Sequence, residues 1–348
     1  MTVTSMRGRR GVLAGGLALL GFAWVGLAAV AQEVATRSYR PELPAGLDLY
    51  MPVPEDNPLT PARVALGRRL FFDPVLSRDG TVGCATCHDP RRVFTDGLPH
   101  AIGIDGRVGH RHVPTLVNRG YGRAFFWDGR AGGLEEQALQ PIDHPDEFGS
   151  SVADAIARLQ ERPAYVAEFR SAFGRDPNPD DVARALAGYV RTILSGDAPI
   201  DRFVAGDAAA LTADQRSGLR LFRGRGNCTA CHFGPTFSDE QFHNTGIAFR
   251  SDGPIDLGRF DVTGDDADRG RFKTPTLREV ARTAPYMHDG SFATLEDIVE
   301  FYDQGGHPNP GLDGEVRPLH LTADEKRVLV VFLGALSGRV TEGQVVAR

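Results

Sequence analysis

The sequence predicts a mostly α-helical protein built from two homologous units. Helix start signals precede apolar residues at helical spacing in several segments, whereas strand signals are sparse. One five-residue cysteine pattern occurs twice in the 348 residues, at 84–88 and at 228–232. Matching words follow both copies at equal spacing, which is typical of an internal duplication.

An export signal is predicted at residues 1–31. Three arginines within residues 7–10 form a positive head, an apolar stretch follows, and Ala29-Val30-Ala31 fits the small-x-small pattern of a cleavage site. The alternative is an uncleaved membrane anchor, because the apolar run is nearly long enough to span a bilayer. We favour cleavage, which predicts a periplasmic protein without stable membrane association.

The charge balance argues against nucleic acid as a partner. The formal net charge is −6, and cleavage after residue 31 would lower it to −9, because the signal carries three arginines and no acid. Phosphate contacts need clustered Lys and Arg, and the remaining sequence has no basic run. An acidic protein suits a basic partner, such as a small electron carrier.

All four cysteines lie in the two pentads, Cys84-Ala85-Thr86-Cys87-His88 and Cys228-Thr229-Ala230-Cys231-His232. Cys-x-x-Cys-His is the attachment signature for c-type haem, whose iron is bound by the adjacent imidazole. Structural zinc does not require His at the same place in both copies. A thioredoxin-like pair would need a βαβ setting, and a two-residue gap rarely serves as a structural disulfide. The pattern therefore predicts two covalently attached haems, one in each unit.

The words that follow the pentads fix the register of the duplication. Thirteen residues after the proline of each Pro-Thr-Leu word lies an aromatic or imidazole residue followed by Asp-Gly. A Leu-Glu pair begins seven residues after that residue. The matching words are Pro114-Thr115-Leu116 and Pro275-Thr276-Leu277, Trp127-Asp128-Gly129 and His288-Asp289-Gly290, and Leu134-Glu135 and Leu295-Glu296. We therefore predict two cytochrome c domains, at 32–200 and 201–348.

Helices are expected in both units. Thr60 and Thr212 are N-cap residues of helices that lead into the pentads. Further helices are expected after the Asp-Gly turns and in the region between the units. Their expected ranges are 134–139, 295–302, 151–173 and 180–194.

The duplication also distinguishes the two irons. Fourteen residues past His288 lies Tyr302, whereas the equivalent place past Trp127 holds Pro141. A phenolate can bind iron and proline cannot, so the second iron would be closed and suited to electron transfer. The first iron would be open to a small oxidant. Tyr302 could instead be a packed aromatic, and Met287 and His288 are other candidate axial ligands.

These motifs resemble those of the bacterial di-haem cytochrome c peroxidases and their MauG-like branch, over nearly all of the mature chain. The resemblance rests on both pentads, PTLVN at 114–118, FWDGR at 126–130, TPTLR at 274–278 and PYMHDG at 285–290. It implies that the haem at His88 reacts with hydrogen peroxide and that the haem at His232 transfers electrons.

The resemblance also assigns two catalytic residues. Trp127 matches the family's tryptophan between the haems, and Glu147, twenty residues further on, matches its catalytic glutamate. A carboxylate there can take a proton from one peroxide oxygen and deliver it to the other. Without the resemblance, Trp127 would be read as a core residue and Glu147 as a solvated loop acid.

Three positions depart from the family or choose between its branches. Ile104 replaces the histidine that ordinary members carry sixteen residues after the first pentad histidine, which predicts a permanently five-coordinate iron at His88. Tyr302 stands where ordinary peroxidases carry Met and MauG carries Tyr. His112 replaces the Asn of an inter-haem calcium site whose carbonyl ligands map to Thr283 and Pro285, which counts against calcium.

The sequence therefore predicts a periplasmic di-haem peroxidase of the MauG-like type. Its electrons would come through the second haem, either from a small redox protein or from a side chain of a partner protein. The alternative is a non-enzymatic di-haem electron carrier, which would need both irons six-coordinate. Family members are often dimers, so a homodimer is a further expectation of the resemblance.

Overall fold

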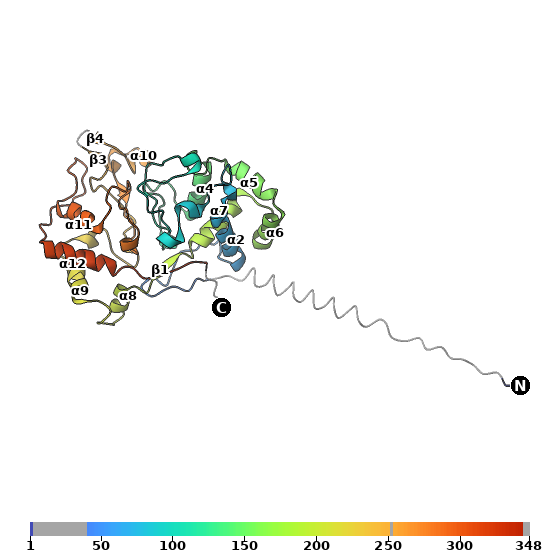
Figure 1. Ribbon diagram of the computed structural model, residues 1–348, viewed down its shortest axis with the longest axis horizontal. Coiled ribbons are helices and arrows are strands. Elements are labelled where there is room, and N and C mark those ends of the chain that lie inside the picture. The colour runs from blue at the N-terminus through green and yellow to red at the C-terminus, as the bar shows by residue number, and fades with distance from the viewer. Residues whose placement is uncertain (3–39, 251–252, 344–348) are drawn as a thin grey trace.

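The computed structural model describes residues 1–2, 40–250 and 253–343 (Figure 1). The export signal predicted at 1–31 therefore lies outside the described residues, except for the first two. Within the described ranges, no helix is long and apolar enough to cross a membrane. Helices form most of the regular structure, since each strand in these ranges has only two or three residues. The predicted helical fold class agrees with this architecture.

The first half is built on the crossing of α2 (Pro61–Phe72) and α7 (Pro179–Val190). The Thr60 side chain caps α2 by accepting a hydrogen bond from the Arg63 N–H. At the crossing, a Cβ on Gly67 would lie 1.9 Å from the Ala185 carbonyl oxygen, so only glycine allows this approach. The other helices of this half are α3 (Cys84–Cys87), α4 (Leu134–Asp143), α5 (Val152–Gln160) and α6 (Pro163–Phe173).

The second half repeats this arrangement with α9 (Ala213–Arg223) and α12 (Ala323–Gly334). Gly218 of α9 lies at the crossing, where a Cβ would be 2.1 Å from the Val328 carbonyl oxygen. Gly67 and Gly218 occupy matching places in the two helices that lead to the pentads, so the duplication extends to the helix packing. This half also contains α8 (Pro199–Val204), α10 (Phe260–Thr263) and α11 (Leu295–Asp303).

The expected helices are present, with two differences. The segment 151–173 is divided, because Pro163 starts a new helix after Arg162. The helix expected over 180–194 ends at Val190, since residues 194–196 form strand β1 (Leu194–Gly196). Helix α12 was not expected from the sequence, although Thr322 and Glu325 form a capping box at its start.

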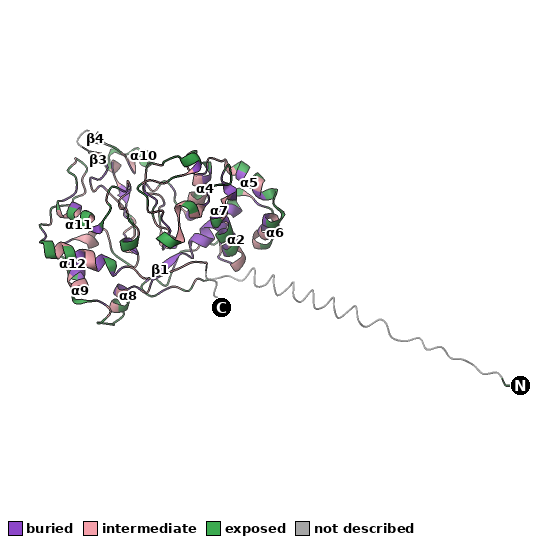
Figure 2. Ribbon diagram, in the orientation of Figure 1, coloured by how far each residue is buried: buried purple, intermediate pink, exposed green. Residues whose placement is uncertain are grey.

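The segment between the halves is held by both. Strand β1 pairs antiparallel with β6 (Arg339–Thr341), and both β1 and α7 are largely buried (Figure 2). The backbone of Ser195 exchanges hydrogen bonds with the Asn118 side chain, while its hydroxyl donates to Glu279 Oε1 at 2.6 Å. Asn118 and Glu279 are equivalent positions of the two units. The same position of the duplicated sequence therefore hydrogen-bonds to strand β1 from each unit.

The remaining strands form two small hairpin-like pairs in the second half. Strand β2 (Phe242–His243) pairs antiparallel with β5 (Phe272–Lys273), and β3 (Phe249–Arg250) pairs with β4 (Gly253–Pro254). Strand β5 continues directly into the Pro-Thr-Leu word at Pro275. Its Lys273 therefore lies on the side of the second half that faces the first, where its N–H donates to the Trp127 carbonyl at 2.8 Å.

Candidate functional site

A cavity of about 1330 Å³ is lined by residues of both halves. A single small-molecule site typically occupies only ~300–1,000 Å³. Six pentad residues line the cavity, namely Cys87, His88, Cys228, Ala230, Cys231 and His232. The remaining pentad cysteine, Cys84, packs against the hydrophobic core of the first half. Both pentads thus border one cavity, and its size suits two large cofactors.

The two pentad histidines have the tautomer and the protonation state that a metal ion requires. Nδ1 of His88 lies 2.9 Å from the Phe94 carbonyl oxygen, and Nδ1 of His232 lies 2.9 Å from that of Phe237. Because a carbonyl only accepts hydrogen bonds, each Nδ1 carries the proton and each Nε2 keeps its lone pair. Burial lowers the pKa of His88 to about 4 and also lowers the pKa of His232. Both imidazoles are therefore neutral at pH 7, the form that binds iron.

The equivalent helices α4 and α11 border the same cavity with different residues. Pro141 of α4 and Tyr302 of α11 both line it. Burial raises the pKa of Tyr302, and the nearby Cys231 and Cys228 raise it further. The other candidate axial ligands, Met287 and His288, also line the cavity. His288 is buried, and its ring stacks on Phe272 with centroids 3.7 Å apart.

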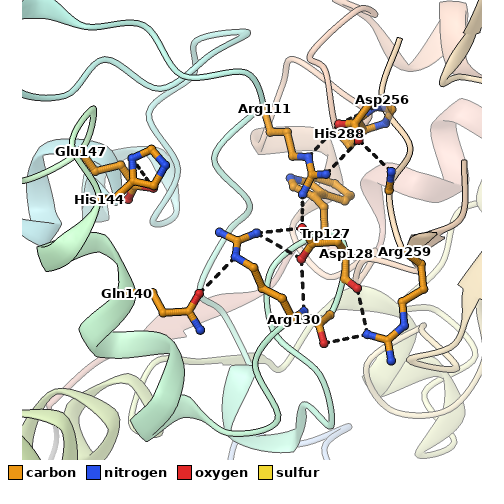
Figure 3. A network of polar contacts seen from close by, with 12 residues as sticks. Arg111, Trp127, Asp128, Arg130, Gln140, His144, Glu147, Asp256, Arg259 and His288 are labelled. Carbon is orange, nitrogen blue, oxygen red and sulfur yellow. Dashed lines mark hydrogen bonds and ion pairs between the residues drawn. The ribbon is translucent and has the colours of Figure 1, made fainter. Parts of the chain in front are cut away.

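Trp127 lies where the halves meet (Figure 3). Its indole Nε1 donates to the His112 carbonyl at 2.8 Å, and its ring centroid is 6.5 Å from that of His288. The backbone contacts are reciprocal: Lys273 N–H donates to the Trp127 carbonyl, and His112 N–H donates to the His288 carbonyl at 2.7 Å. Since these four residues form two equivalent pairs, the indole sits in a rigid, pseudosymmetric junction.

Glu147 also lines the cavity, beside His144 (Figure 3). Its side chain is 39 % exposed, and its Oε1 lies 3.9 Å from His144 Nδ1. Burial of the carboxyl raises the pKa of Glu147 above its ordinary value. The Glu147 carbonyl accepts a hydrogen bond from Ile104 N–H at 2.9 Å. Ile104 itself is buried, whereas His100 and His110 line the cavity.

A cluster of ion pairs joins the halves next to Trp127. Arg111 lies 2.6 Å from Asp128 and 2.8 Å from Asp256, and Arg130 lies 2.9 Å from Asp128 (Figure 3). Arg111 and Asp128 come from the first half and Asp256 from the second. Two cations thus balance two carboxylates at this place.

The residues at the expected calcium position do not fit that ion. His112 is buried, and its Nδ1 lies 2.8 Å from the Leu98 carbonyl oxygen, so this nitrogen is a donor. Burial also lowers the pKa of His112. A hard cation prefers oxygen ligands, and a neutral imidazole supplies none. Although Thr283 and Pro285 line the cavity, the third protein ligand of such a site is missing.

Sequence reasoning missed a second group of charged residues at the cavity wall. Arg119 and Lys273 line the cavity, and both lie near Glu240. All three side chains are about one-tenth exposed. Arg119 belongs to the first half, whereas Glu240 and Lys273 belong to the second. Their contact therefore cannot be predicted from a spacing along the chain. The only sequence signal is that Lys273, like His112, stands two residues before a Pro-Thr-Leu word.

Comparison with known proteins identifies the family. Residues 61–209 match the family model described as di-haem cytochrome c peroxidase. The methylamine utilization protein MauG of Methylorubrum extorquens is 43 % identical over 288 residues, which cover 82 % of this chain and 81 % of MauG. The chain belongs to the di-haem cytochrome c peroxidase family. Its relatives include the cytochrome-c peroxidase IdrP2 of Denitromonas iodatirespirans, 39 % identical over 91 % of this chain and 90 % of that protein.

Solved structures agree with this assignment. A MauG-like protein associated with microbial copper homeostasis has a TM-score of 0.77 and 33 % identity, covering 84 % of this chain and 95 % of that one. The diheme peroxidase BthA of Burkholderia thailandensis has a TM-score of 0.69 and 26 % identity, covering 87 % and 92 %.

Family membership confirms three expectations from the sequence. The resemblance to di-haem peroxidases and MauG is confirmed, the protein is an oxidoreductase of the peroxidase type, and it carries two covalently bound c-type haems. Hydrogen peroxide and a protein partner or substrate are its reactants. The cavity, with its two metal-ready imidazoles, fits this pair of cofactors.

Proposed function

We propose that the protein is an exported, MauG-like peroxidase in which the two haems have different tasks. The haem held by Cys84, Cys87 and His88 would be open to peroxide. The haem held by Cys228, Cys231 and His232 would carry Tyr302 as its second axial ligand and pass electrons. The domains would be residues 32–200 and 201–348. The observation that carries this proposal is the asymmetry at equivalent positions of one cavity, Pro141 against Tyr302.

The first haem, held by Cys84, Cys87 and His88, would supply the iron at which peroxide is reduced. Glu147 accepts a proton from the near oxygen of hydrogen peroxide and returns it to the far oxygen, which leaves as water. The raised pKa of Glu147 suits this exchange, because it makes the carboxylate a stronger proton acceptor than an ordinary glutamate. Ile104, at the position where ordinary family members carry a histidine, cannot bind iron, so it would leave the first haem accessible to peroxide.

Trp127 is the group that passes electrons between the haems. Its indole is fixed by the hydrogen bond to the His112 carbonyl, and its own carbonyl is fixed by Lys273. A fixed orientation keeps the separation between the redox partners constant from one turnover to the next. Reduction of one hydrogen peroxide to two waters consumes two protons and two electrons, and the partner supplies the electrons.

We propose that the partner is oxidised on one of its side chains, as the MauG-like ligand pattern favours. A phenolate ligand stabilises ferric iron, so a haem that carries Tyr302 is a poor acceptor from a soluble carrier of high potential. A small redox protein as donor is the other outcome of the test below. The protein would work in the periplasm. His112 counts against the calcium site of the family, and formation of a homodimer stays a prediction.

The test uses the ferric holoprotein. Its electronic spectrum should contain a high-spin component from the open haem, and peroxide should produce a long-lived oxidised state that changes the bands of both haems. Small cytochromes should be turned over feebly. Rapid cytochrome oxidation would instead identify a redox protein as the donor and contradict protein modification. Two low-spin, six-coordinate haems would support the non-enzymatic electron carrier and contradict the peroxidase site.

A further inference from the structure

Lys273 places an amino group in the wall of the haem cavity. Only two lysines occur in the sequence, Lys273 and Lys326, so an ammonium is rare in this protein. The Lys273 side chain is 9 % exposed and lines the cavity. Burying a charge is costly unless the charge is paired and hydrogen-bonded, so the partners of Lys273 decide what this group does.

The protein satisfies this ammonium only in part. Nζ donates to the Thr274 carbonyl at 3.1 Å, while its nearest carboxylate oxygen, Glu240 Oε1, is 3.6 Å away. The second distance exceeds that of a hydrogen bond. An ammonium has three donors, and one of them has a protein acceptor at hydrogen-bond distance.

Glu240 is committed to other donors. Arg119 binds it through two contacts, Nη1 to Oε1 at 2.7 Å and Nη2 to Oε2 at 3.1 Å, and Arg123 N–H donates to Oε2 at 3.2 Å. Asp239 is the other acid that acts on Lys273, but its carboxylate lies 2.9 Å from His243 Nε2. The two nearby acids are therefore already paired.

Two effects destabilise the protonated form of Lys273. Burial, followed by repulsion from Arg119, lowers the pKa of Lys273 to about 7, although Glu240 and Asp239 act in the opposite direction. An additional anion in the cavity would relieve both. The cofactor brings such anions, because each haem carries two carboxylate side chains.

We propose that Lys273 binds a carboxylate of the haem that Cys228 and Cys231 attach, because the pairing of Glu240 with Arg119 leaves the ammonium available to the cavity. The second haem is favoured because Lys273 belongs to its half and lies close enough to act electrostatically on His232. The equivalent residue of the first half, His112, offers no ammonium and donates Nδ1 to a carbonyl. This proposal depends on haem attachment but not on the peroxidase reaction.

The test compares Lys273→Met and Lys273→Arg in the holoprotein, with Lys326→Met as the matched control, because Lys326 is not among the residues that line the cavity. The midpoint potential of each haem is measured by spectroelectrochemistry, and the carboxylate bending modes of the haems by resonance Raman spectroscopy. Loss of the cation leaves a haem carboxylate uncompensated, which favours the ferric state. Lys273→Met should therefore lower the ferrous-to-ferric ratio of the second haem about tenfold at a fixed potential, equivalent to about 59 mV for one electron.

The controls separate this role from a structural one. Lys273→Arg should restore most of the potential and the Raman bands, and Lys326→Met should change neither. The proposal is wrong if Lys273→Met, with both haems attached, leaves the potential and bands of the second haem unchanged or alters only the first haem. If Lys273→Met does not acquire both haems, Glu240→Gln is the test instead. This variant removes the acid that competes for the ammonium, so the midpoint potential of the second haem should rise. An unchanged or lower potential contradicts the proposal. Loss of peroxide reactivity alone bears on the proposed function and leaves these readouts unaffected.

Discussion

Single positions of the duplicated sequence have diverged in chemistry while keeping their place in the fold. Pro141 and Tyr302 occupy equivalent helices on one cavity, and His112 and Lys273 make equivalent backbone hydrogen bonds across the junction. In each pair the backbone role is shared and the side-chain role is not. The second half has a phenol and an amine, whereas the first half has a proline and an imidazole whose pKa is lowered by burial. These few differences between equivalent positions are the basis for proposing different tasks for the two haems.

Glu147 should be the proton-transfer group for peroxide. Glu147→Gln removes the group that accepts and returns the proton, so the reaction of the ferric protein with peroxide should slow by about 10²–10⁴-fold. Because the carboxylate is the active form and burial raises its pKa, the wild-type rate should fall as pH is lowered through that raised value. The variant should lose this dependence. Stopped-flow spectroscopy across pH measures both effects.

Glu161→Gln, an exposed acid at the end of α5, is the matched control and should react like the wild type. A Glu147→Gln protein that carries both haems and still reacts within a few-fold of the wild-type rate would show that another group moves the proton.

At the scale of helices and strands, capping residues in the sequence correctly predicted where helices begin. Thr60 and Thr212 start α2 and α9 as expected, because a cap acts within one turn. The helix expected over 180–194 stops early because β1 pairs with β6, whose residues lie far away in the sequence. No local pattern reveals such a partner.

In the candidate site too, some residues could be predicted from the sequence and others could not. The pentads, Trp127 and Tyr302 could be found because the duplication and family motifs fix them at constant spacing. Arg119 and Glu240 could not, since their ion pair joins residues 121 positions apart and follows no period. Motif residues are therefore predictable from the sequence, whereas the charged residues that surround the cavity emerge only from the packing of the two halves.

The cap of α9 should contribute measurably to stability. The Thr212 hydroxyl accepts from Gln215 N–H at 3.2 Å, and Gln215 Oε1 accepts from Thr212 N–H at 2.9 Å. Thr212→Ala removes the first bond and should lower the free energy of unfolding by about 1 kcal/mol. Denaturant unfolding measures this change. Thr212→Ser keeps the hydroxyl and should retain most of the stability, so equal midpoints for Ala and Ser would contradict the cap.

At the scale of the whole molecule, several contacts at the junction of the halves occur twice, once with a residue of the first half and once with its counterpart in the second. The backbone bonds at Trp127 and His288 are reciprocal, and Asn118 and Glu279 hold the same residue, Ser195. Such contacts fix the two pentads relative to each other. Electron transfer between two haems needs a constant separation, and a junction built from equivalent contacts would help to maintain it.

Arg111 tests this junction, since it is the cation between Asp128 of the first half and Asp256 of the second. Arg111→Met leaves Asp128 its contact with Arg130 but removes the charged partner that Asp256 has within 3 Å. Asp256 is only 17 % exposed, so the free energy of unfolding should fall by about 3 kcal/mol, as for a broken buried ion pair. Unfolding followed by haem absorbance measures it.

Two further variants show whether the lost stability belongs to the ion pair. Asp256→Asn added to Arg111→Met should restore part of the stability, because the buried carboxylate is then neutral. Arg327→Gln removes an exposed arginine that pairs with Asp214 and Asp324, and it should leave the unfolding midpoint unchanged. If Arg111→Met has the same unfolding midpoint as the wild type, the junction is held by its backbone hydrogen bonds and apolar contacts. If the double variant is no more stable than the single one, packing of the guanidinium, rather than its charge, joins the halves.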